Sequence, residues 1–276
     1  MNIIQRNFFR LIRSGALGKQ EQVEPMSVCK WGKLYQLAVI HNVADYVYEG
    51  LQQRRDQFFL RLTEKQWSQW QNTIDELKRK PYQDDEEEDE FLRADHLTNP
   101  ILNHKLQAIL DDENSDIRTR QLLLFIIRTS RHILNEGVPI RQLVNIGHYL
   151  HTDGDRVDFV TLGKWLKSLH LQQVAQLEGA LLTELLDYER EAIPFMSDKT
   201  DKNVERVAQE LTEFTNTHIQ DFSFQQNADS IFVHTNNGSA MLGHIRRSAR
   251  YFRYFPSETV TNFFASFAHS LSHIEE

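Results

Sequence analysis

The sequence predicts a mostly α protein built from two helical modules, and three observations support this class. With six prolines and eleven glycines in 276 residues, the chain has few breaks for its length. Most apolar residues recur at spacings of three and four, which places them on one face of a helix. At most one short β-hairpin is expected, at 222–236, where the extended pattern of Ser230 to His234 precedes the turn-prone Asn237 and Gly238.

The first module is expected at residues 1–81, and its first helix starts at Ile3 and is ended by Gly15 and Gly18. Opposite an apolar face, this helix carries three arginines, Arg6, Arg10 and Arg13. A basic amphipathic helix can lie on a membrane or cover a partner. Packing of the apolar face on the chain's own core is the favoured interpretation, because terminal helices of soluble proteins show the same pattern.

Three more helices are expected in this module. One begins near Trp31, the next runs from His41 to Leu51, and the last runs from Thr63 to Lys80. Thr63 and Gln66 have the spacing of a capping box, and Pro81 cannot continue the helix because it lacks a backbone N–H group.

An acidic run, Asp84 to Glu90, lies within a linker expected at 82–99. A block of like charges this dense repels itself and is typical of a solvated linker. The alternatives are a trap for divalent cations or a docking segment for a basic partner. A metal site needs carboxylates that converge from a fixed backbone, which a flexible string does not provide, so the linker interpretation is favoured.

The second module is expected at 100–276. Its predicted helices are 101–110, 118–135, 140–150, 159–169, 171–186, 202–218, 242–255 and 258–273. Asp158 stands at the position of an N-cap for the fourth of them.

Composition and charge exclude several classes of function. The net charge of −8 argues against a general nucleic-acid binder, which needs excess lysine and arginine to neutralise phosphates. Cys29 is the one cysteine, so the chain forms no internal disulfide and no cysteine-based zinc cage. Neither a targeting segment nor an apolar run of about 18 residues is visible, and a cytoplasmic location is expected.

A second cluster of polar residues, at 148–158, is the strongest metal candidate. His148 and His151 are three residues apart and precede three aspartates, Asp153, Asp155 and Asp158. The Asp153–Asp155 segment resembles the opening of a calcium loop, but no glutamate closes the loop. A polar corner between two helices is the favoured interpretation, because turns need Gly and Asp for backbone reasons alone.

Near the C-terminus, arginines recur on one face of the predicted helix 242–255. Arg246, Arg250 and Arg253 lie on this face at i, i+4 and i+7, interleaved with Tyr251, Phe252 and Tyr254, and Arg247 lies beside them. Arginines at this spacing could clamp a phosphate group. The alternative is a helix whose aromatic residues are core and whose arginines pair with the surplus acids.

Several segments, taken in order, resemble an uncharacterised bacterial family of nucleotidyltransferases in the polymerase-β-like superfamily. They read FFRLIRSG at 8–15, WGKLYQLA at 31–38, HNVA at 41–44 and EGVPIRQL at 136–143. Asp158 and Phe159 followed by Trp165, and the arginine-rich segment before Glu258, continue the resemblance. Together these segments touch about two thirds of the chain.

The resemblance implies a strand-borne Gly-Asp-x-Asp motif whose two aspartates hold a divalent metal on a nucleoside triphosphate. This chain departs from that pattern. The interval between the acidic run and Glu136 reads as helices and leaves no room for a sheet, and Gly154 to Asp158 has the wrong spacing. Asn145 also stands where the family tends to have an aspartate. We therefore expect a shortened relative that lacks the catalytic core.

Two functions follow as hypotheses. The first is a non-catalytic binding or regulatory module without a cofactor. It would bind a protein partner, such as a full-length nucleotidyltransferase, or a phosphate-bearing ligand through Arg141, Arg246, Arg247 and Arg250. The alternative is an active Mg-dependent nucleotidyltransferase that transfers a nucleotide to a sugar, protein or small-molecule acceptor, with the metal on Asp153, Asp155 and Asp158.

Overall fold

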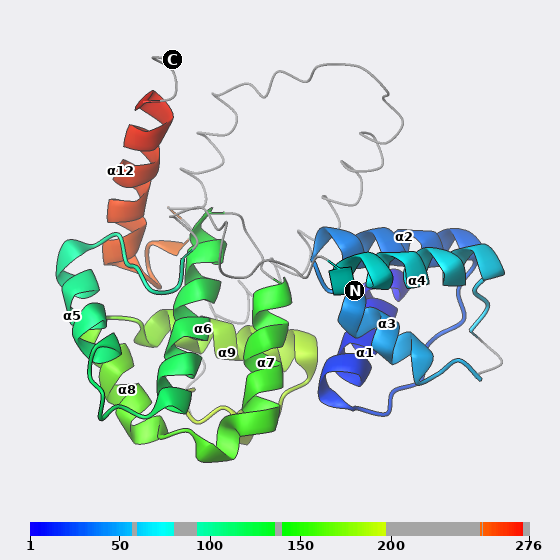
Figure 1. Cartoon of the computed structure of the whole chain (residues 1–276), viewed down its shortest axis with the longest axis horizontal. Helices are drawn as coiled ribbons and strands as arrows, with labels where there is room; N and C mark the ends of the chain where they lie inside the picture. Colours follow the sequence, from blue (N-terminus) through cyan, green and yellow to red (C-terminus); the bar gives the residue numbers. More distant parts are fainter. Residues whose placement is uncertain (57–59, 80–92, 136–139, 197–248, 250, 273–276) are drawn as a thin grey trace.

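A computed structural model describes residues 1–56, 60–79, 93–135, 140–196, 249 and 251–272. Every regular element within these ranges is a helix (Figure 1), which confirms the predicted fold class. The possible hairpin at 222–236, the predicted helix 202–218, the acidic run 84–90 and most of the predicted helix 242–255 lie outside the described residues. The division into modules at 81 and 100 stays a prediction.

The N-terminal helices are α1 (Ile3–Leu17), α2 (Val28–Ile40), α3 (Ala44–Gln52) and α4 (Glu64–Arg79). The C-terminal helices are α5 (Pro100–Leu110), α6 (Ile117–Asn135), α7 (Ile140–Asp153), α8 (Phe159–Ser168), α9 (Gln172–Leu186) and α12 (Pro256–Ser272). Two short 3₁₀ helices, η1 (Gly154–Arg156) and η2 (Arg190–Ala192), follow α7 and α9.

Helix ends follow the capping chemistry of the sequence. Gly18 ends α1 in the left-handed conformation (φ 66°), as predicted. The Thr63 hydroxyl accepts from the Gln66 backbone N–H at 3.2 Å, and Thr63 N donates to the Gln66 side chain at 3.1 Å. These two bonds complete the expected capping box of α4.

Three boundaries differ from the prediction by three residues each. Helix α2 starts at Val28, because the side chain of Ser27 caps it. The chain then turns at Asn42, whose backbone is left-handed (φ 54°), so α3 starts at Ala44. Asparagine tolerates this conformation better than other residues with a side chain. Helix α7 runs three residues past Leu150, to Asp153.

Helices α1 and α3 approach each other closely at two glycines. A Cβ atom on Gly15 would overlap the backbone carbonyl oxygen of Tyr46, and one on Gly50 would overlap that of Leu11. The missing side chains let the two backbones touch, and the flanking Phe8, Leu11 and Val47 are completely buried. The glycines are therefore required by packing in addition to any role at a helix end.

The arginine face of α1 folds back on the chain. Arg6 and Arg10 form ion pairs with Glu24, and Arg13 pairs with Glu21. The hydrogen bond from Arg6 lowers the pKa of the Glu24 carboxyl to about 2. Since the opposite face is buried in the core, α1 packs on its own protein, as the sequence interpretation favoured.

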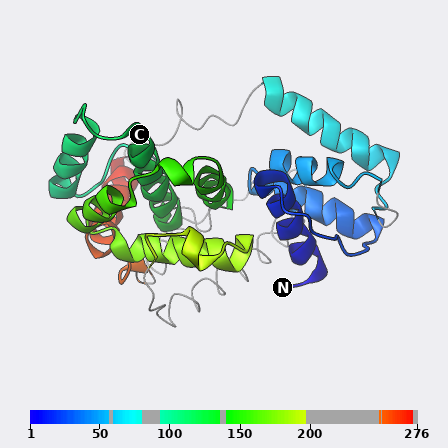
Figure 2. The ribbon, with the colours of Figure 1, turned by 90° about the horizontal axis from the view of Figure 1, so that it is seen from below.

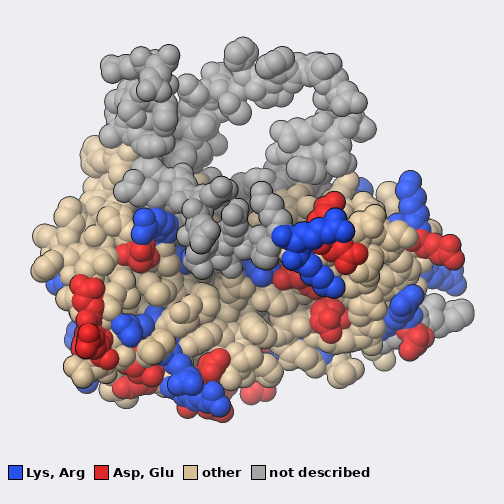
Figure 3. All heavy atoms as spheres, in the orientation of Figure 1, with Lys and Arg blue, Asp and Glu red and all other residues tan. Residues whose placement is uncertain are grey.

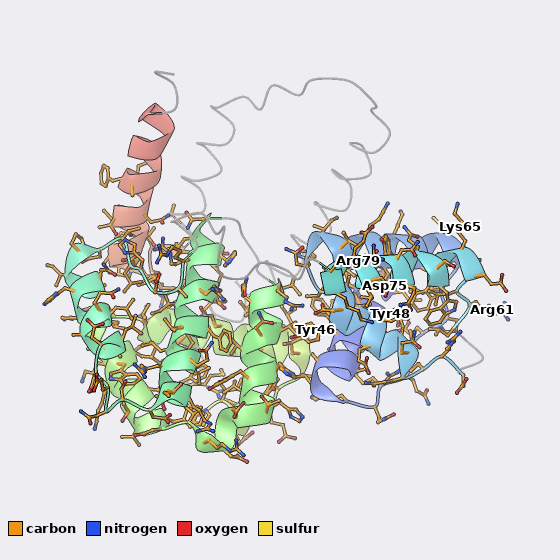
Figure 4. The ribbon with its side chains drawn as sticks, viewed as in Figure 1. Tyr46, Tyr48, Arg61, Lys65, Asp75 and Arg79 are labelled. Carbon is orange, nitrogen blue, oxygen red and sulfur yellow. The ribbon has the colours of Figure 1, made fainter. Side chains whose placement is uncertain are left out.

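Helix α4 packs on α2 and α3 through aromatic side chains and exposes a polar face. The Trp70 ring lies edge-on to Tyr35, with centroids 4.9 Å apart, and stacks on Tyr48 at 6.4 Å. Lys65 and Arg79, at the two ends of α4 (Figure 4), are exposed. This helix is thus held by a narrow apolar stripe.

Helix α6 is central among the C-terminal helices and contacts α7, α8 and α9. Figure 2 shows α9 lying across the bundle towards the N-terminal helices.

Helix α9 carries an ionisable side chain in the apolar core. Glu178 is completely buried, and neither of its carboxylate oxygens has a hydrogen-bond partner among the described residues. Burial raises the pKa of Glu178 well above its usual range.

We predict that Gly15→Ala lowers the free energy of unfolding by about 2 to 3 kcal/mol, because the methyl group forces α1 and α3 apart. The matched control is Gly32→Ala in α2, where no described atom outside the neighbouring turns of the helix lies within 4 Å of an added Cβ. That change should be neutral or should stabilise by about 0.5 to 1 kcal/mol through helix propensity. Urea unfolding monitored by circular dichroism measures both. Equal midpoints for Gly15→Ala and the wild type would contradict the close approach.

We predict that Glu178→Gln stabilises the protein increasingly as pH rises from about 4.3, the ordinary glutamate pKa, to 8. Above that pKa the unfolded chain releases the proton while the folded chain keeps it, so the wild type loses stability as pH rises until its raised pKa is passed. The control is Glu184→Gln, at an exposed position of the same helix. Urea unfolding at several pH values gives the two slopes. Parallel slopes for Glu178→Gln and the wild type would show that Glu178 is ionised in the folded protein.

Candidate functional site

The candidate site lies at the junction where the N-terminal helices meet the C-terminal helices. Helix α1 contacts α7 and α9, and Figures 1 and 2 show this meeting from two directions. Sequence separation across the junction is large, so no local pattern in the sequence marks it.

Side chains at the junction cap helix ends of the opposite half. Arg13 donates to the Leu185 carbonyl at 3.0 Å, and the Lys19 ammonium donates to the Asp187 carbonyl, both at the C-terminal end of α9. In return, His148 Nδ1 of α7 lies 2.9 Å from the Ala16 carbonyl in the last turn of α1. Cations are favoured at helix C-termini, where carbonyl groups lack partners within the helix.

Arg141, which the sequence analysis named as a phosphate ligand, is part of this junction. Its Nη1 donates to the two Asp45 carboxylate oxygens at 2.7 and 2.6 Å and to the Asn42 carbonyl at 3.2 Å. The guanidinium carbon lies 4.7 Å from the ring centroid of Tyr46, whose position on α3 beside α7 is labelled in Figure 4. The planar guanidinium therefore satisfies an acid and an aromatic face together.

Behind Arg141, a chain of polar groups links three helices. The Tyr46 hydroxyl donates to the Asn145 Oδ1 at 3.4 Å, and Asn145 Nδ2 donates to Gln142 Oε1 at 3.4 Å. Gln142 Nε2 in turn lies 3.2 Å from His132 Nε2. We call the six residues Asp45, Tyr46, His132, Arg141, Gln142 and Asn145 the junction cluster. The cluster combines the Arg141 cation, the Asp45 anion, the ring of Tyr46 and neutral side chains that can donate and accept hydrogen bonds. Such a set of groups is suited to binding a polar ligand and holding it in one orientation.

The three aspartates of the metal hypothesis do not form a common site. Asp158 caps α8, where its Oδ1 accepts from the Val160 and Thr161 N–H groups at 3.0 Å each. The Thr161 hydroxyl lowers the pKa of Asp158 by a further hydrogen bond. Asp153 lies 3.5 Å from Arg118 and 3.6 Å from Arg156, and Asp155 is exposed in η1. The expected polar corner is what the structure shows.

No group of three or more His, Cys, Asp or Glu side chains within the described ranges could hold a metal ion. The other three predicted phosphate ligands, Arg246, Arg247 and Arg250, lie outside the described residues. Arg141 is therefore the one predicted ligand whose surroundings are described. Figure 3 shows blue and red side chains side by side over the described part of this face, in keeping with the paired charges around α1.

A buried carboxylate that the sequence analysis did not single out joins α5, α6 and α12. Glu258 accepts from the Thr98 N–H at 2.9 Å and from the Asn99 N–H at 2.7 Å. It also forms an ion pair with Arg131 of α6, with 3.5 Å between Oε2 and Nη1, and both side chains are almost completely buried. A residue 160 positions away supplies this carboxylate to Thr98, so no local pattern could have assigned its role.

Comparison of the chain with protein-family models, with curated proteins and with solved structures gives no match. The resemblance to nucleotidyltransferases therefore remains a hypothesis that rests on the quoted segments. Among the helices that the structure describes, none is long and apolar enough to cross a membrane.

Proposed function

We propose that the chain is a non-catalytic binding module, descended from the nucleotidyltransferases that it resembles, and that α12 is the element through which it binds a partner protein. The observation that supports this proposal is an exposed apolar face on a helix that is fixed to the bundle at its first turns. Figure 1 shows α12 rising from the side of α5.

The first turns of α12 are held firmly. Besides the buried Glu258, the Thr261 hydroxyl lies 2.7 Å from that of Thr98, and Asn262 Nδ2 donates to Asn135 Oδ1 at 2.8 Å. Asn262 is buried, so this side of the helix faces α5 and α6. The hydrogen bonds of Glu258, Thr261 and Asn262 on the anchored side fix the orientation of the helix relative to the bundle.

On the other side of the first turns of α12, two apolar side chains face solvent. Val260 is 42% exposed and Phe264, one turn later, is 64% exposed. Ile101, two residues after Asn99 at the anchor, is 72% exposed. After Glu258, the sequence of α12 contains no Asp, Glu, Lys or Arg, in a chain that is 25% charged. Grouped apolar exposure of this kind marks protein interfaces, where charged residues are depleted.

The geometry fits a helix that lays its apolar face into a groove of another protein. Residues at i and i+4, such as Val260 and Phe264, are the anchors in this mode of recognition. The resemblance makes a full-length nucleotidyltransferase the first partner to test. An aromatic anchor in the centre of such a contact carries a large share of the binding energy.

We predict that a photo-crosslinking amino acid at position 264 captures a specific partner in cells, and that one at Val28 of α2, which is 51% exposed, does not. Mass spectrometry identifies the adduct, and the partner is then purified. Phe264→Ala should weaken its affinity for the whole chain by about tenfold or more, because an aromatic anchor is lost. Val28→Ala should leave the affinity unchanged.

Three results would contradict this proposal. In the first, the adduct at 264 consists only of the chain itself, and in the second, the same proteins are captured from 264 and from 28. Equal affinity of the purified partner for Phe264→Ala and for the wild type would show that α12 is not the binding element. Circular dichroism of each variant confirms that the helical fold is intact.

A further inference from the structure

We propose that the corner where the first turns of α6 and α8 meet is a second docking surface, and that it binds a segment of a partner protein with both basic and aliphatic side chains. We call residues 111–120 and 153–164 the α6–α8 corner. Helix α6 starts at this corner, and α12 is anchored to Asn135 at the other end of the same helix (Figure 1). The two surfaces are therefore separate, and this inference is independent of the role of α12.

Two aliphatic side chains at the α6–α8 corner face solvent. Ile117, the first residue of α6, is 72% exposed, and Val160, the second residue of α8, is 71% exposed. The backbone N–H of Asp158 donates to the Thr119 hydroxyl at 2.9 Å and joins the two first turns, so both side chains belong to one surface. Single exposed aliphatic residues are ordinary, whereas grouped ones mark sites of interaction.

The backbone beneath these side chains is fixed. Thr119 is completely buried, and its hydroxyl donates to the Asp116 carboxylate at 2.7 Å. Asp116 and Asp158 also accept from backbone N–H groups in the first turns of α6 and α8. The Tyr149 hydroxyl of α7 donates to the Arg118 carbonyl at 3.0 Å. A surface with a backbone held in this way loses little conformational entropy on binding.

The α6–α8 corner carries a surplus of negative charge. Its two segments contain seven acidic and four basic residues. Arg118 and Arg156 both lie beside one acid, Asp153, at 3.5 and 3.6 Å, and Arg120 donates to a backbone carbonyl of α5 at 2.8 Å. Figure 3 shows acidic side chains, in red, along the lower edge of the C-terminal half. The potential around the two aliphatic side chains is therefore negative.

Part of this charge lies where it does not stabilise the fold. Asp111, Asp112 and Glu113 follow the C-terminal end of α5, where the helix dipole is negative and favours cations. All three are exposed, and none forms an ion pair with a described residue. Departures from local stability rules are expected at functional sites, and here exposed aliphatic residues and unpaired acids occur together.

These two features together specify the occupant. Negative charge attracts a lysine- or arginine-rich segment and speeds its association, while aliphatic residues of the same segment would cover Ile117 and Val160. A divalent cation would leave both aliphatic side chains exposed, and no metal-binding group of three acids or histidines exists among the described residues. Nucleic acid would be repelled by the surplus of acids. The occupant is thus a basic protein segment with interspersed aliphatic residues.

Fluorescence anisotropy with a labelled peptide of alternating lysine and leucine, at low ionic strength, tests the proposal on the full chain. The double variant Ile117→Ser with Val160→Ser should bind the peptide about tenfold or more weakly, because two apolar contacts are lost. The matched control is Val28→Ser with Val39→Ser, which removes two exposed aliphatic side chains from α2. This control and Phe264→Ala of α12 should bind as the wild type does.

A second pair of variants tests the charge. Asp111→Asn with Asp112→Asn should weaken binding by about threefold or more at low salt, because two exposed charges no longer attract the peptide. The charge-matched control is Asp84→Asn with Asp85→Asn in the acidic run, which should have a smaller effect. Circular dichroism checks the helical fold of each variant. The aliphatic and the charge variants alter different groups, so failure of one to fold leaves the other decisive.

Four results would overturn the proposal. The aliphatic double variant binds as its α2 control does, or a peptide of lysine and serine binds as tightly as the peptide of lysine and leucine. In the third, the two charge variants lose equal affinity, which would make the attraction a property of the whole chain. In the fourth, calcium chloride displaces the peptide more than sodium chloride of the same ionic strength, which would show that the acids bind a cation instead.

Discussion

The contact between α1 and α3 on one side and α7 and α9 on the other is the constraint on which the remaining structure depends. Helix ends leave backbone carbonyls without partners, and here each half of the molecule supplies the other's missing donors. Arg13 and Lys19 reach the end of α9, while His148 reaches the end of α1. These bonds need both halves at a fixed distance, so they specify how the halves meet as well as stabilise the contact.

The internal packing of each half makes that contact possible. Gly15 and Gly50 let α1 and α3 touch along their backbones, which presents Asp45 and Tyr46 of α3 towards α7. On the other side, α6, α7 and α9 pack around completely buried side chains such as Ile126 and Leu181. The junction cluster is therefore polar chemistry supported by two apolar cores, and its geometry follows from theirs.

Local sequence patterns predicted the structural features that depend on residues close together in the chain. The capping box of Thr63 and Gln66, the left-handed Gly18 and the N-cap role of Asp158 all depend on bonds that span three residues or fewer, or on one backbone conformation. The start of α2 at Val28 and the turn at Asn42 follow from the same chemistry, but weaker signals mark them. Such patterns do not predict contacts between residues that are far apart in the sequence. Arg141 was singled out, yet its partner Asp45 lies 96 positions away, and the same holds for Glu258 and Thr98.

The junction between the two halves is held by contacts between residues that are far apart in the sequence, among them the ion pair of Asp45 and Arg141. The central claim of this account is that these two residues stabilise each other across the junction, and a double-mutant cycle on the unfolding free energy tests it most directly. The variants are Asp45→Asn, Arg141→Gln and the pair, each unfolded in urea. We expect a coupling energy of about 1 kcal/mol or more, typical of residues in direct contact. Effects that add to within about 0.3 kcal/mol would show that the two side chains are independent, and would contradict the account.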